Sequence, residues 1–279
     1  MSATWRLIVD EADDGAWNMA VDEAILEAYE RGAGSPGPTL RLYGWNPATI
    51  SLGRSQSNSG SHDPVVVLRE GIGLVRRPSG GTAVLHEFER TYAVVGGLRR
   101  PPFSGGVTGA YRAIAGALTR GLRRLGIAAD AVEPRRGMRE TATSVCFERA
   151  GAWEIEAGGR KLVGSAQVRR RAAVLQHGSI PIRLDPERLE SVLGRKVNGR
   201  RFIDVERAAG CEIDAGALDA ACISGFEEAF GATLLPGRLA EDEALRAAEL
   251  RCWKYDSMAW TRDGRIGPRE SRWGPSLLR

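Results

Sequence analysis

Short runs in which apolar and polar residues alternate recur through the chain and predict β-strands. The strands that this pattern predicts cover residues 5–9, 40–43, 49–52, 73–75 and 91–95. Apolar residues at helical spacing predict longer helices. These helices cover about 18–31, 108–126 with Thr108 as the cap, 215–230 and 240–252. An Asp-Pro pair followed by glycine predicts two short helices as well, over 64–71 and 186–194.

The clearest turn signal lies between residues 153 and 163. Trp153–Ala157 alternates at the strand period, Gly158-Gly159 is typical of a two-residue hairpin turn, and Arg160–Val163 forms the returning strand. This register places Glu156 directly opposite Lys161. A cross-strand ion pair with Glu156 is therefore one expected role for Lys161.

Strands interspersed with single helices, together with clear hairpins, predict an α/β fold of the α+β type. We expect mixed, largely antiparallel sheets flanked by helices. The chain contains no tandem repeat and no low-complexity linker. The pattern therefore predicts a main domain over residues 1–235 and a small helical C-terminal extension over 236–279 that packs on it.

Composition excludes several classes of protein. The chain has 279 residues, of which 43% are hydrophobic and 27% charged, as in ordinary globular proteins. It has no apolar run long enough for a membrane helix and no signal-peptide pattern in residues 1–13. Its four cysteines lack CxxC spacing, so we expect neither disulfides nor a zinc site. These features predict a cytoplasmic protein with reduced thiols that binds no membrane.

The net charge of +4 conceals an unusual use of basic residues, because only three of the 39 are lysine. Coding bias can explain this preference, but Lys161 remains of interest because lysine offers a compact charge that arginine does not. Two arginine clusters, at 135–136 and 169–171, raise the question of nucleic-acid binding. The small net charge and the lack of interleaved aromatic residues argue against such a partner.

Residues 76–86 form a glycine-rich stretch with two possible interpretations. Arg76 and Arg77 carry bidentate donors suited to carboxylate or phosphate oxygens. Gly80 and Gly81 allow the backbone to approach a ligand closely, and His86 ends the apolar run that follows. A hairpin turn with two solvated arginines is the alternative, and this stretch alone does not decide between the two.

Among the cysteines, only Cys146 lies in a polar stretch, whereas Cys222 falls on an apolar helix face where packing explains it. A thiol becomes nucleophilic where a cation lowers its pKa. Lys161 could supply that cation, because the hairpin can fold it back toward Cys146, which lies 161 − 146 = 15 residues earlier. After it, the small residues Gly164-Ser165-Ala166 suit a strand whose backbone passes close to a ligand. The three histidines are too scattered in sequence to indicate a metal site, so we expect none.

Several segments in one order resemble the lipoate-protein ligase and octanoyltransferase family. The similarity runs from Trp5 to about Trp260, and the nearest branch is that of the octanoyltransferases that resemble lipoate ligase in sequence. The segments that carry it are Asn18–Ala24, Leu40–Pro47, Arg76–His86, Gly159–Gln167 and Gln176–Ser179.

The resemblance implies a biotin/lipoate-protein ligase-like catalytic domain, here an acyltransferase domain over residues 1–235. It implies that octanoate passes from acyl carrier protein to Cys146 as a thioester, and then to a lysine of a lipoyl domain such as glycine cleavage H protein. Lys161 would lower the pKa of the thiol and polarise the acyl carbonyl. No cofactor is implied, and we expect a monomer. The residues expected to bind the substrate are Arg76, Arg77, Gly80, Gly81, Thr82, His86, Gly164, Ser165 and Ala166.

Two positions depart from the family pattern, which has arginine where Thr82 stands and aspartate where Glu87 stands. Two alternative activities also remain. An ATP-dependent lipoate ligase would use Arg76 or Arg77 and the Gly80-Gly81 backbone to bind the adenylate phosphate, although adenylation needs no thiol such as that of Cys146. An amidotransferase would instead move octanoyl between two lipoyl domains, and the sequence does not distinguish between donors.

Overall fold

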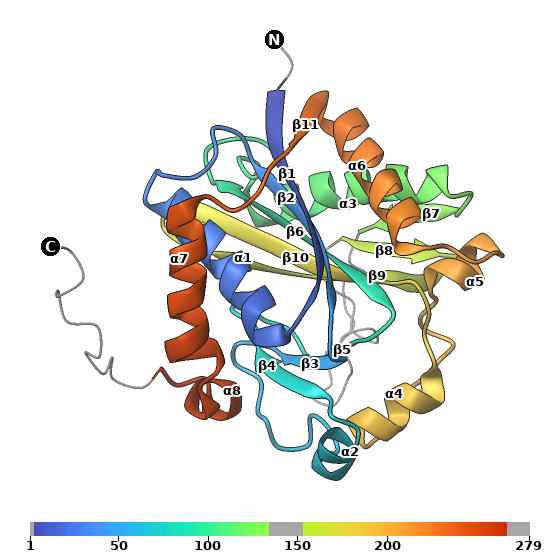
Figure 1. Cartoon of the computed structure of the whole chain (residues 1–279). Helices are drawn as coiled ribbons and strands as arrows, with labels where there is room; N and C mark the ends of the chain where they lie inside the picture. The colour runs from blue at the N-terminus through green and yellow to red at the C-terminus, as the bar shows by residue number, and fades with distance from the viewer. Residues whose placement is uncertain (1–2, 134–152, 267–279) are drawn as a thin grey trace, which may run out of the picture.

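The computed structural model describes residues 3–133 and 153–266, which fold around a central eight-stranded sheet (Figure 1). In sheet order its strands are β11 (Ala232–Pro236), β1 (Ala3–Asp13), β2 (Thr39–Trp45), β6 (Glu89–Gly97), β10 (Ala173–Pro181), β9 (Arg160–Arg169), β8 (Glu154–Ala157) and β7 (Ala129–Val132). Strand β1 is parallel to both of its neighbours, and every pair from β2 to β7 is antiparallel. The predicted α/β class with mixed, largely antiparallel sheets is therefore confirmed.

A second sheet of three strands lies at one end of the first. Its order is β4 (Gly73–Arg76), β3 (Thr49–Leu52) and β5 (Val84–His86), with β3 parallel to β4 and antiparallel to β5. The glycine-rich stretch connects β4 to β5. Two short helices, α2 (Pro64–Arg69) and α4 (Pro186–Leu193), flank this small sheet, and both begin with an Asp-Pro cap as predicted.

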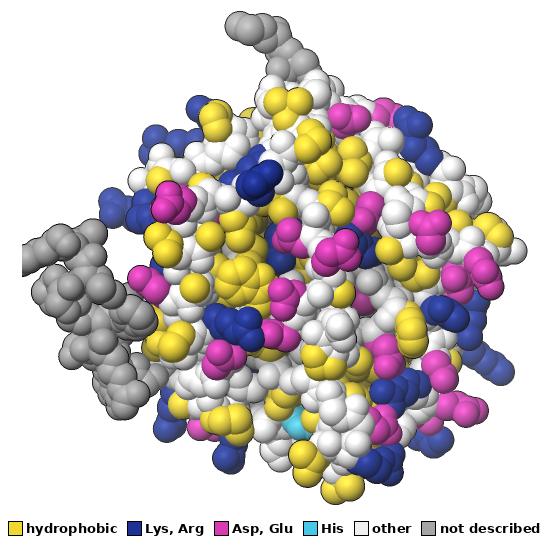
Figure 2. Space-filling view, viewed as in Figure 1, with side chains coloured by type: hydrophobic (Ala, Val, Ile, Leu, Met, Phe, Trp, Pro, Cys, Tyr) yellow, Lys and Arg dark blue, Asp and Glu magenta, His cyan; other side chains and the backbone are white. Residues whose placement is uncertain are grey.

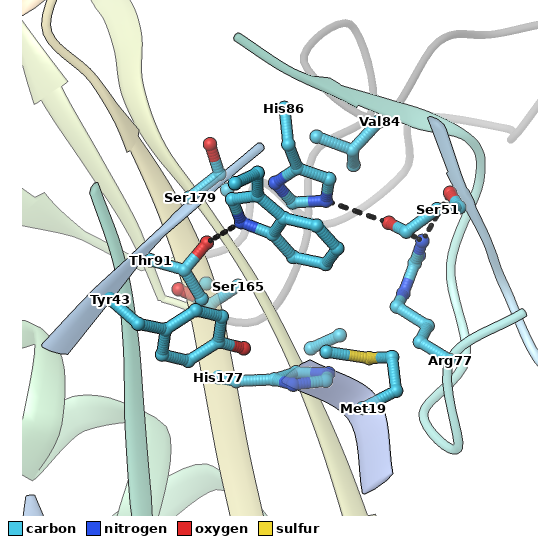
Figure 3. Close-up of a pocket in the computed structure, with 14 residues that line it drawn as sticks. Met19, Tyr43, Ser51, Arg77, Val84, His86, Thr91, Ser165, His177 and Ser179 are labelled. Atoms are coloured by element: carbon cyan, nitrogen blue, oxygen red, sulfur yellow. Dashed lines mark hydrogen bonds between the residues drawn. The ribbon is translucent and has the colours of Figure 1, made fainter. Parts of the chain in front are cut away.

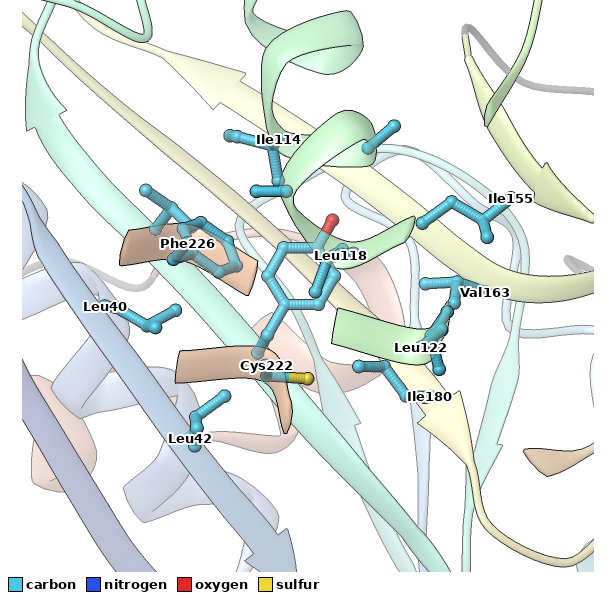
Figure 4. Packing of buried hydrophobic residues seen from close by; sticks show 14 of the residues in the cluster. Leu40, Leu42, Ile114, Leu118, Leu122, Ile155, Val163, Ile180, Cys222 and Phe226 are labelled. Carbon is cyan, nitrogen blue, oxygen red and sulfur yellow. The ribbon is translucent and has the colours of Figure 1, made fainter. Parts of the chain in front are cut away.

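Helices cover both faces of the central sheet, because alternate residues of its strands point to opposite sides. On one side, Leu40 and Leu42 pack against α3 (Gly106–Arg124) and α6 (Ala215–Phe230) (Figure 4). On the other side, Tyr43 packs in a second core with α1 (Gly15–Glu30). The predicted Thr108 cap is wrong: α3 begins at Gly106, and its N-cap residue Gly105 makes no side-chain capping bond.

Helices α3 and α6 approach each other closely because glycines lie at their contact. A Cβ at Gly121 would lie 2.5 Å from the carbonyl oxygen of Ala221, and one at Gly225 would lie 2.4 Å from that of Ala117. These contacts are between backbones, which cannot move aside as a flexible side chain can.

We therefore expect Gly121→Ala to destabilise the protein by about 1–3 kcal/mol, since an added methyl group overpacks this contact. Gly109→Ala in the same helix is the matched control, because a Cβ there meets no neighbouring atom. That change should be neutral, or stabilising by up to about 1 kcal/mol, because alanine favours the helix. Urea unfolding followed by circular dichroism measures both, and equal effects would contradict the packing account.

Beyond β11 the chain forms α7 (Glu241–Leu250), a π-helical turn η2 (Arg251–Tyr255) and α8 (Met258–Asp263). Helix α7 and η2 pack on α1, and α8 packs on β4 (Figure 1). A further short helix, α5 (Val205–Ala209), follows α4. Helices α7, η2 and α8 occupy the region predicted as a C-terminal extension, and the boundary at residue 235 stays a prediction.

The surface carries both signs of charge. On the face shown in Figure 2, Lys and Arg side chains alternate with Asp and Glu, and no single sign covers a large continuous area. Within the described ranges, no helix is both long and apolar enough to span a lipid bilayer.

Candidate functional site

A narrow, largely apolar cavity lies between the central sheet and the small sheet (Figure 3). Its empty volume, which includes space open to solvent, is about 360 Å³. Its walls come from α1, from β2, β6, β9 and β10 of the large sheet, and from the small sheet with its loop. The residues that line it are Met19, Tyr43, Trp45, Ser51, Arg77, Val84, His86, Thr91, Gly164, Ser165, Ala166, His177, Gly178 and Ser179.

Five of the predicted substrate-binding residues meet at this cavity although they are far apart in sequence. They are Arg77, His86, Gly164, Ser165 and Ala166. The other described candidates do not line it. Gly80 and Gly81 are exposed at the tip of the loop. Arg76 and Thr82 are buried in the same stretch, and Lys161 is buried in β9. Cys146 lies outside the described residues.

Arg77 shapes the glycine-rich loop from inside. Its Nη1 donates to the carbonyl oxygen of Ser51 at 2.9 Å and to Ser51 Oγ at 3.1 Å. Its Nη2 donates to the carbonyl oxygens of Gly80 at 2.8 Å and Thr82 at 2.9 Å. The loop closes so tightly on this guanidinium that a Cβ at Gly81, where φ is +98°, would lie 2.6 Å from Arg77 Nη2. Position 81 thus requires glycine, and the alternative of a turn with solvated arginines is wrong.

Arg76 points away from the cavity and is also fully buried. Its Nη1 donates to the carbonyl oxygens of Gly53 and Gln56, both at 2.7 Å, and its other donors reach carbonyls of α8. Both arginines of the loop therefore bind backbone oxygens of this chain in this structure.

His86 lies at the wall of the cavity (Figure 3), and three neighbours fix its ring. Its ring stacks on Trp45 with 3.9 Å between centroids. Its Nε2 lies 2.8 Å from Ser51 Oγ, and its Nδ1 lies 3.2 Å from Glu89 Oε1. Burial lowers the pKa of His86 below its usual value. The Glu89 carboxylate acts in the opposite direction, but burial has the larger effect. The ring is therefore neutral at neutral pH and adds no charge to an apolar wall.

This lowered pKa predicts a pH dependence of stability. As the pH falls below about 6.5, the unfolded chain protonates His86 before the folded protein does, so the free energy of unfolding decreases. We expect His86→Gln to lose less stability than the wild type between pH 7.5 and pH 5.5. Urea unfolding at the two pH values measures this difference, and an identical loss in both proteins would contradict it. His62, whose pKa burial also lowers, is present in both proteins and cancels in the comparison.

A second chain of hydrogen bonds ties the loop to the central sheet and to α1. His177 Nε2 lies 2.6 Å from Ser79 Oγ of the loop, and His177 Nδ1 lies 3.0 Å from Asp22 Oδ2. Asp22 also accepts from Arg41 Nη1 and Tyr43 OH, both at 2.9 Å. Burial alone raises the pKa of Asp22, but the hydrogen bond from His177 and the Arg41 guanidinium bring it below its usual value. The carboxylate is thus ionised and fixes the orientation of His177.

Lys161 is buried in β9, and Glu156 lies opposite it as the hairpin register predicts. Its ion-pair partner, however, is Glu154, with Nζ 2.5 Å from Oε1. The expected pair with Glu156 is therefore wrong. Glu154 lies two residues from Glu156 on the same face of β8, and the long lysine side chain pairs with this diagonal neighbour instead. Lys161 and Gly164 lie on the same strand, about 10 Å apart along it at about 3.3 Å per residue.

The two departures from the family pattern differ in their surroundings. Glu87 accepts from Arg188 Nε and Nη2, both at 3.2 Å, so its carboxylate ties the turn after β5 to α4. Thr82 is buried, and its Oγ1 has no hydrogen-bond partner among the described residues.

Several cavity residues were not among the predicted site residues. Met19, Tyr43, Trp45 and His177 lie in segments that carry the family resemblance, so those segments could have indicated these residues as part of the site. Ser51 lies on an ordinary buried strand that gave none. Across the part of the chain that the structure covers, no cluster of His, Cys, Asp or Glu could bind a metal ion.

Comparisons with known proteins agree with this geometry. Residues 14–227 match the family model described as the lipoyl protein ligase A/B catalytic domain. The chain is 41% identical to an octanoyltransferase LipM of Kyrpidia tusciae, over 92% of this chain and 98% of that one. It is 40% identical to the octanoyltransferase LipM of Moorella thermoacetica, over 92% and 97% of the two chains. These names support the predicted enzyme class, an acyltransferase.

Solved structures show the same fold. A crystal structure of lipoate-protein ligase A bound with ATP superposes with a TM-score of 0.77 at 25% identity, covering 94% of this chain and 99% of that chain. A T. acidophilum protein with bound lipoic acid gives the same TM-score, identity and coverage. The family model and the curated relatives both extend over most of the residues that build the cavity. The chain therefore belongs to the lipoyl protein ligase A/B catalytic domain family, as its sequence segments predict.

Proposed function

We propose that this chain is an octanoyltransferase of protein lipoylation. It moves octanoate from acyl carrier protein to a lysine of a lipoyl domain, such as that of glycine cleavage H protein, through a thioester on Cys146. The observation that carries this proposal is the largely apolar cavity between the two sheets, in a chain 41% identical to an octanoyltransferase.

The cavity suits the hydrocarbon part of an octanoyl group. Met19, Tyr43, Trp45 and Val84 supply apolar surface, and each buried methylene contributes about 0.8 kcal/mol. Because His86 is neutral, its ring adds no charge to the surface that an octanoyl chain would meet. An adenylate would need a cation left available for its phosphate, whereas Arg76 and Arg77 donate to backbone carbonyls.

The strand segment Gly164–Ala166 brings backbone close to the bound group. Gly178 lies opposite Ser165 on β10, and a Cβ at Gly178 would lie 2.4 Å from the carbonyl oxygen of Gly164. Ser165 Oγ lies 2.7 Å from Tyr92 OH, which fixes its hydroxyl. Small residues here leave room for the acyl chain.

The reaction proceeds in two steps. The thiolate of Cys146 attacks the carbonyl carbon of the octanoyl thioester, the bond to the carrier sulfur breaks, and the carrier leaves as a thiolate that takes up a proton. The lysine amine of the acceptor then attacks the octanoyl-cysteine, the C–S bond breaks, and the amine loses a proton as the amide forms. Covalent catalysis thereby divides one difficult transfer into two easier ones.

In this proposal, Lys161 stabilises the thiolate of Cys146 and polarises the carbonyl oxygen. Backbone N–H groups of the exposed loop residues Gly80 and Gly81 are candidate donors to the oxyanion of each tetrahedral intermediate. A cytoplasmic location and a monomeric state, both predicted from the sequence, complete the proposal.

A comparison of donors tests the proposal. Purified protein is incubated with a lipoyl domain and one of three donors: octanoyl-acyl carrier protein, octanoate with ATP, or a second octanoylated lipoyl domain. We expect transfer from the acyl carrier protein without ATP, detected as an octanoylated acceptor by mass spectrometry. Transfer that requires ATP would support a ligase, and transfer only between lipoyl domains would support an amidotransferase.

A further inference from the structure

The glycine-rich loop is joined to the C-terminal helix α8 by hydrogen bonds in both directions. Arg76, the residue before the loop, donates from Nε to the carbonyl oxygen of Trp260 at 3.0 Å and to that of Thr261 at 3.1 Å. Its Nη2 donates to the carbonyl oxygen of Arg262 at 2.8 Å. In return, Trp260 Nε1 donates to the carbonyl oxygen of Arg76 at 2.8 Å. The guanidinium thus satisfies carbonyls at the end of α8, where a cation is favourable.

Trp260 is the residue through which this contact is fixed. It is 1% exposed, and cationic groups of Arg54 and Lys254 lie over its ring, at 4.5 Å and 4.1 Å from the centroid. Arg54 Nη1 also donates to the carbonyl oxygen of Gly264 at 3.0 Å. Both the ring and the indole N–H are therefore engaged.

Residues 53–56 connect Arg76 to the tip of the loop. Arg76 Nη1 binds the carbonyl oxygens of Gly53 and Gln56, and Arg54 N donates to the carbonyl oxygen of Ser79 at 2.7 Å. Backbone packing is so close that a Cβ at Gly53 would lie 1.9 Å from the carbonyl oxygen of Gly81. A displacement of Arg76 is therefore transmitted to Ser79 and Gly81.

Helix α1 anchors both ends of this arrangement. Lys254 Nζ lies 2.5 Å from Glu23 Oε2, and both side chains are buried. The preceding residue, Asp22, orients His177, which binds Ser79 of the loop. Adjacent residues of one helix thus hold the loop, through His177, and the C-terminal segment that supports it, through Lys254.

We propose that residues 254–264 form a brace that positions the glycine-rich loop for acyl transfer, with Arg76 and Trp260 as its positioning residues. The role in transfer rests on the proposed function, whereas the mechanical role does not. Arg76 thereby acts through the loop and does not touch the substrate.

Hydrogen exchange tests the mechanical part without reference to activity. Trp260→Phe keeps a six-membered aromatic ring and removes the pyrrole part of the indole with its Nε1 donor, so the brace predicts that the amides of Arg54 and of residues 79–82 exchange about tenfold faster. Met258→Ala is the control, because this side chain of α8 is 66% exposed and lies outside the contact. Arg76→Lys, which keeps the charge but loses the forked geometry, is the second variant. Unchanged exchange in Trp260→Phe and Arg76→Lys would overturn the brace.

Octanoyl transfer tests the positioning role. For Trp260→Phe we expect kcat, corrected for the fraction of folded protein, to fall about tenfold while KM for the lipoyl domain stays close to the wild-type value. The melting temperature should fall, because the smaller ring leaves a cavity. Met258→Ala should match the wild type in all three measurements. Faster loop exchange without slower transfer would overturn the positioning role. A wild-type protein that transfers no octanoate would refute the proposed function alone, because the exchange measurement still decides on the brace.

Discussion

Replacing Cys146 with alanine should abolish the acyl-enzyme and reduce octanoyl transfer by about 10⁴-fold or more. In the proposed mechanism this thiol forms the bond to the acyl group, and removing a covalent nucleophile removes the whole two-step route. Binding of the octanoyl chain should persist, because the cavity is built by other elements. Transfer is measured as octanoylated lipoyl domain per unit time, and the acyl-enzyme by intact mass.

The other cysteines provide the controls for this experiment. Cys222 is packed between α6 and α3, and burial raises the pKa of its thiol to about 12, so it is unreactive at neutral pH. Cys222→Ser would disturb that core, so Cys222→Ala is the better variant, and it should retain acylation. Cys211 and Cys252 are exposed, and alanine at either position should also leave the rate unchanged. An adduct that persists in Cys146→Ala would contradict the assignment.

Lys161→Ala should slow the acylation step by about 10²–10³-fold. The lysine is assigned to stabilise the thiolate and the developing oxyanion, and losing one such electrostatic interaction costs this much in other enzymes. Lys161→Arg should restore little of the rate, because a planar, more weakly hydrated guanidinium does not replace a compact ammonium group. Single-turnover acylation with octanoyl-acyl carrier protein isolates this step.

The ion pair between Lys161 and Glu154 supplies the matched control. If the lysine served only this pair, Glu154→Gln and Lys161→Ala should both lower stability and neither should change the acylation rate after correction for folded protein. We expect instead that Glu154→Gln keeps most of the acylation rate, because the ammonium group of Lys161 remains. Equal acylation rates for the wild type and Lys161→Ala would show that the lysine has only a structural role.

Local patterns predicted most of the fold. The Asp-Pro caps of α2 and α4 and the Gly158-Gly159 turn are encoded by neighbouring residues, and all were confirmed. Strand β10 was not predicted, because polar residues such as Gln176 and His177 interrupt its apolar run. Those polar groups are satisfied by contacts from distant elements, for instance Asp22 of α1 with His177. Such long-range contacts produce no periodic pattern of apolar residues in the local sequence.

The site was predictable only where one residue's chemistry was enough to suggest it. The small residues 164–166 and His86 were expected at a ligand site, and the structure places them on one cavity. Arg76 was expected to bind substrate, but it donates to carbonyl oxygens of Gly53 and Gln56 and to that of Trp260, which lies 184 positions away in α8. The predicted partner of Lys161 was Glu156 and the observed one is Glu154, because both glutamates lie on one face of β8 and a long lysine side chain can reach the diagonal neighbour.

The most direct test of the account is the mass of the enzyme after incubation with octanoyl-acyl carrier protein in the absence of ATP. We predict a single octanoyl group, mapped by peptide analysis to Cys146, which disappears when a lipoyl domain is added and reappears on the lysine of that domain. An unmodified enzyme that still transfers octanoate, or transfer that requires ATP and survives Cys146→Ala, would contradict the central claim.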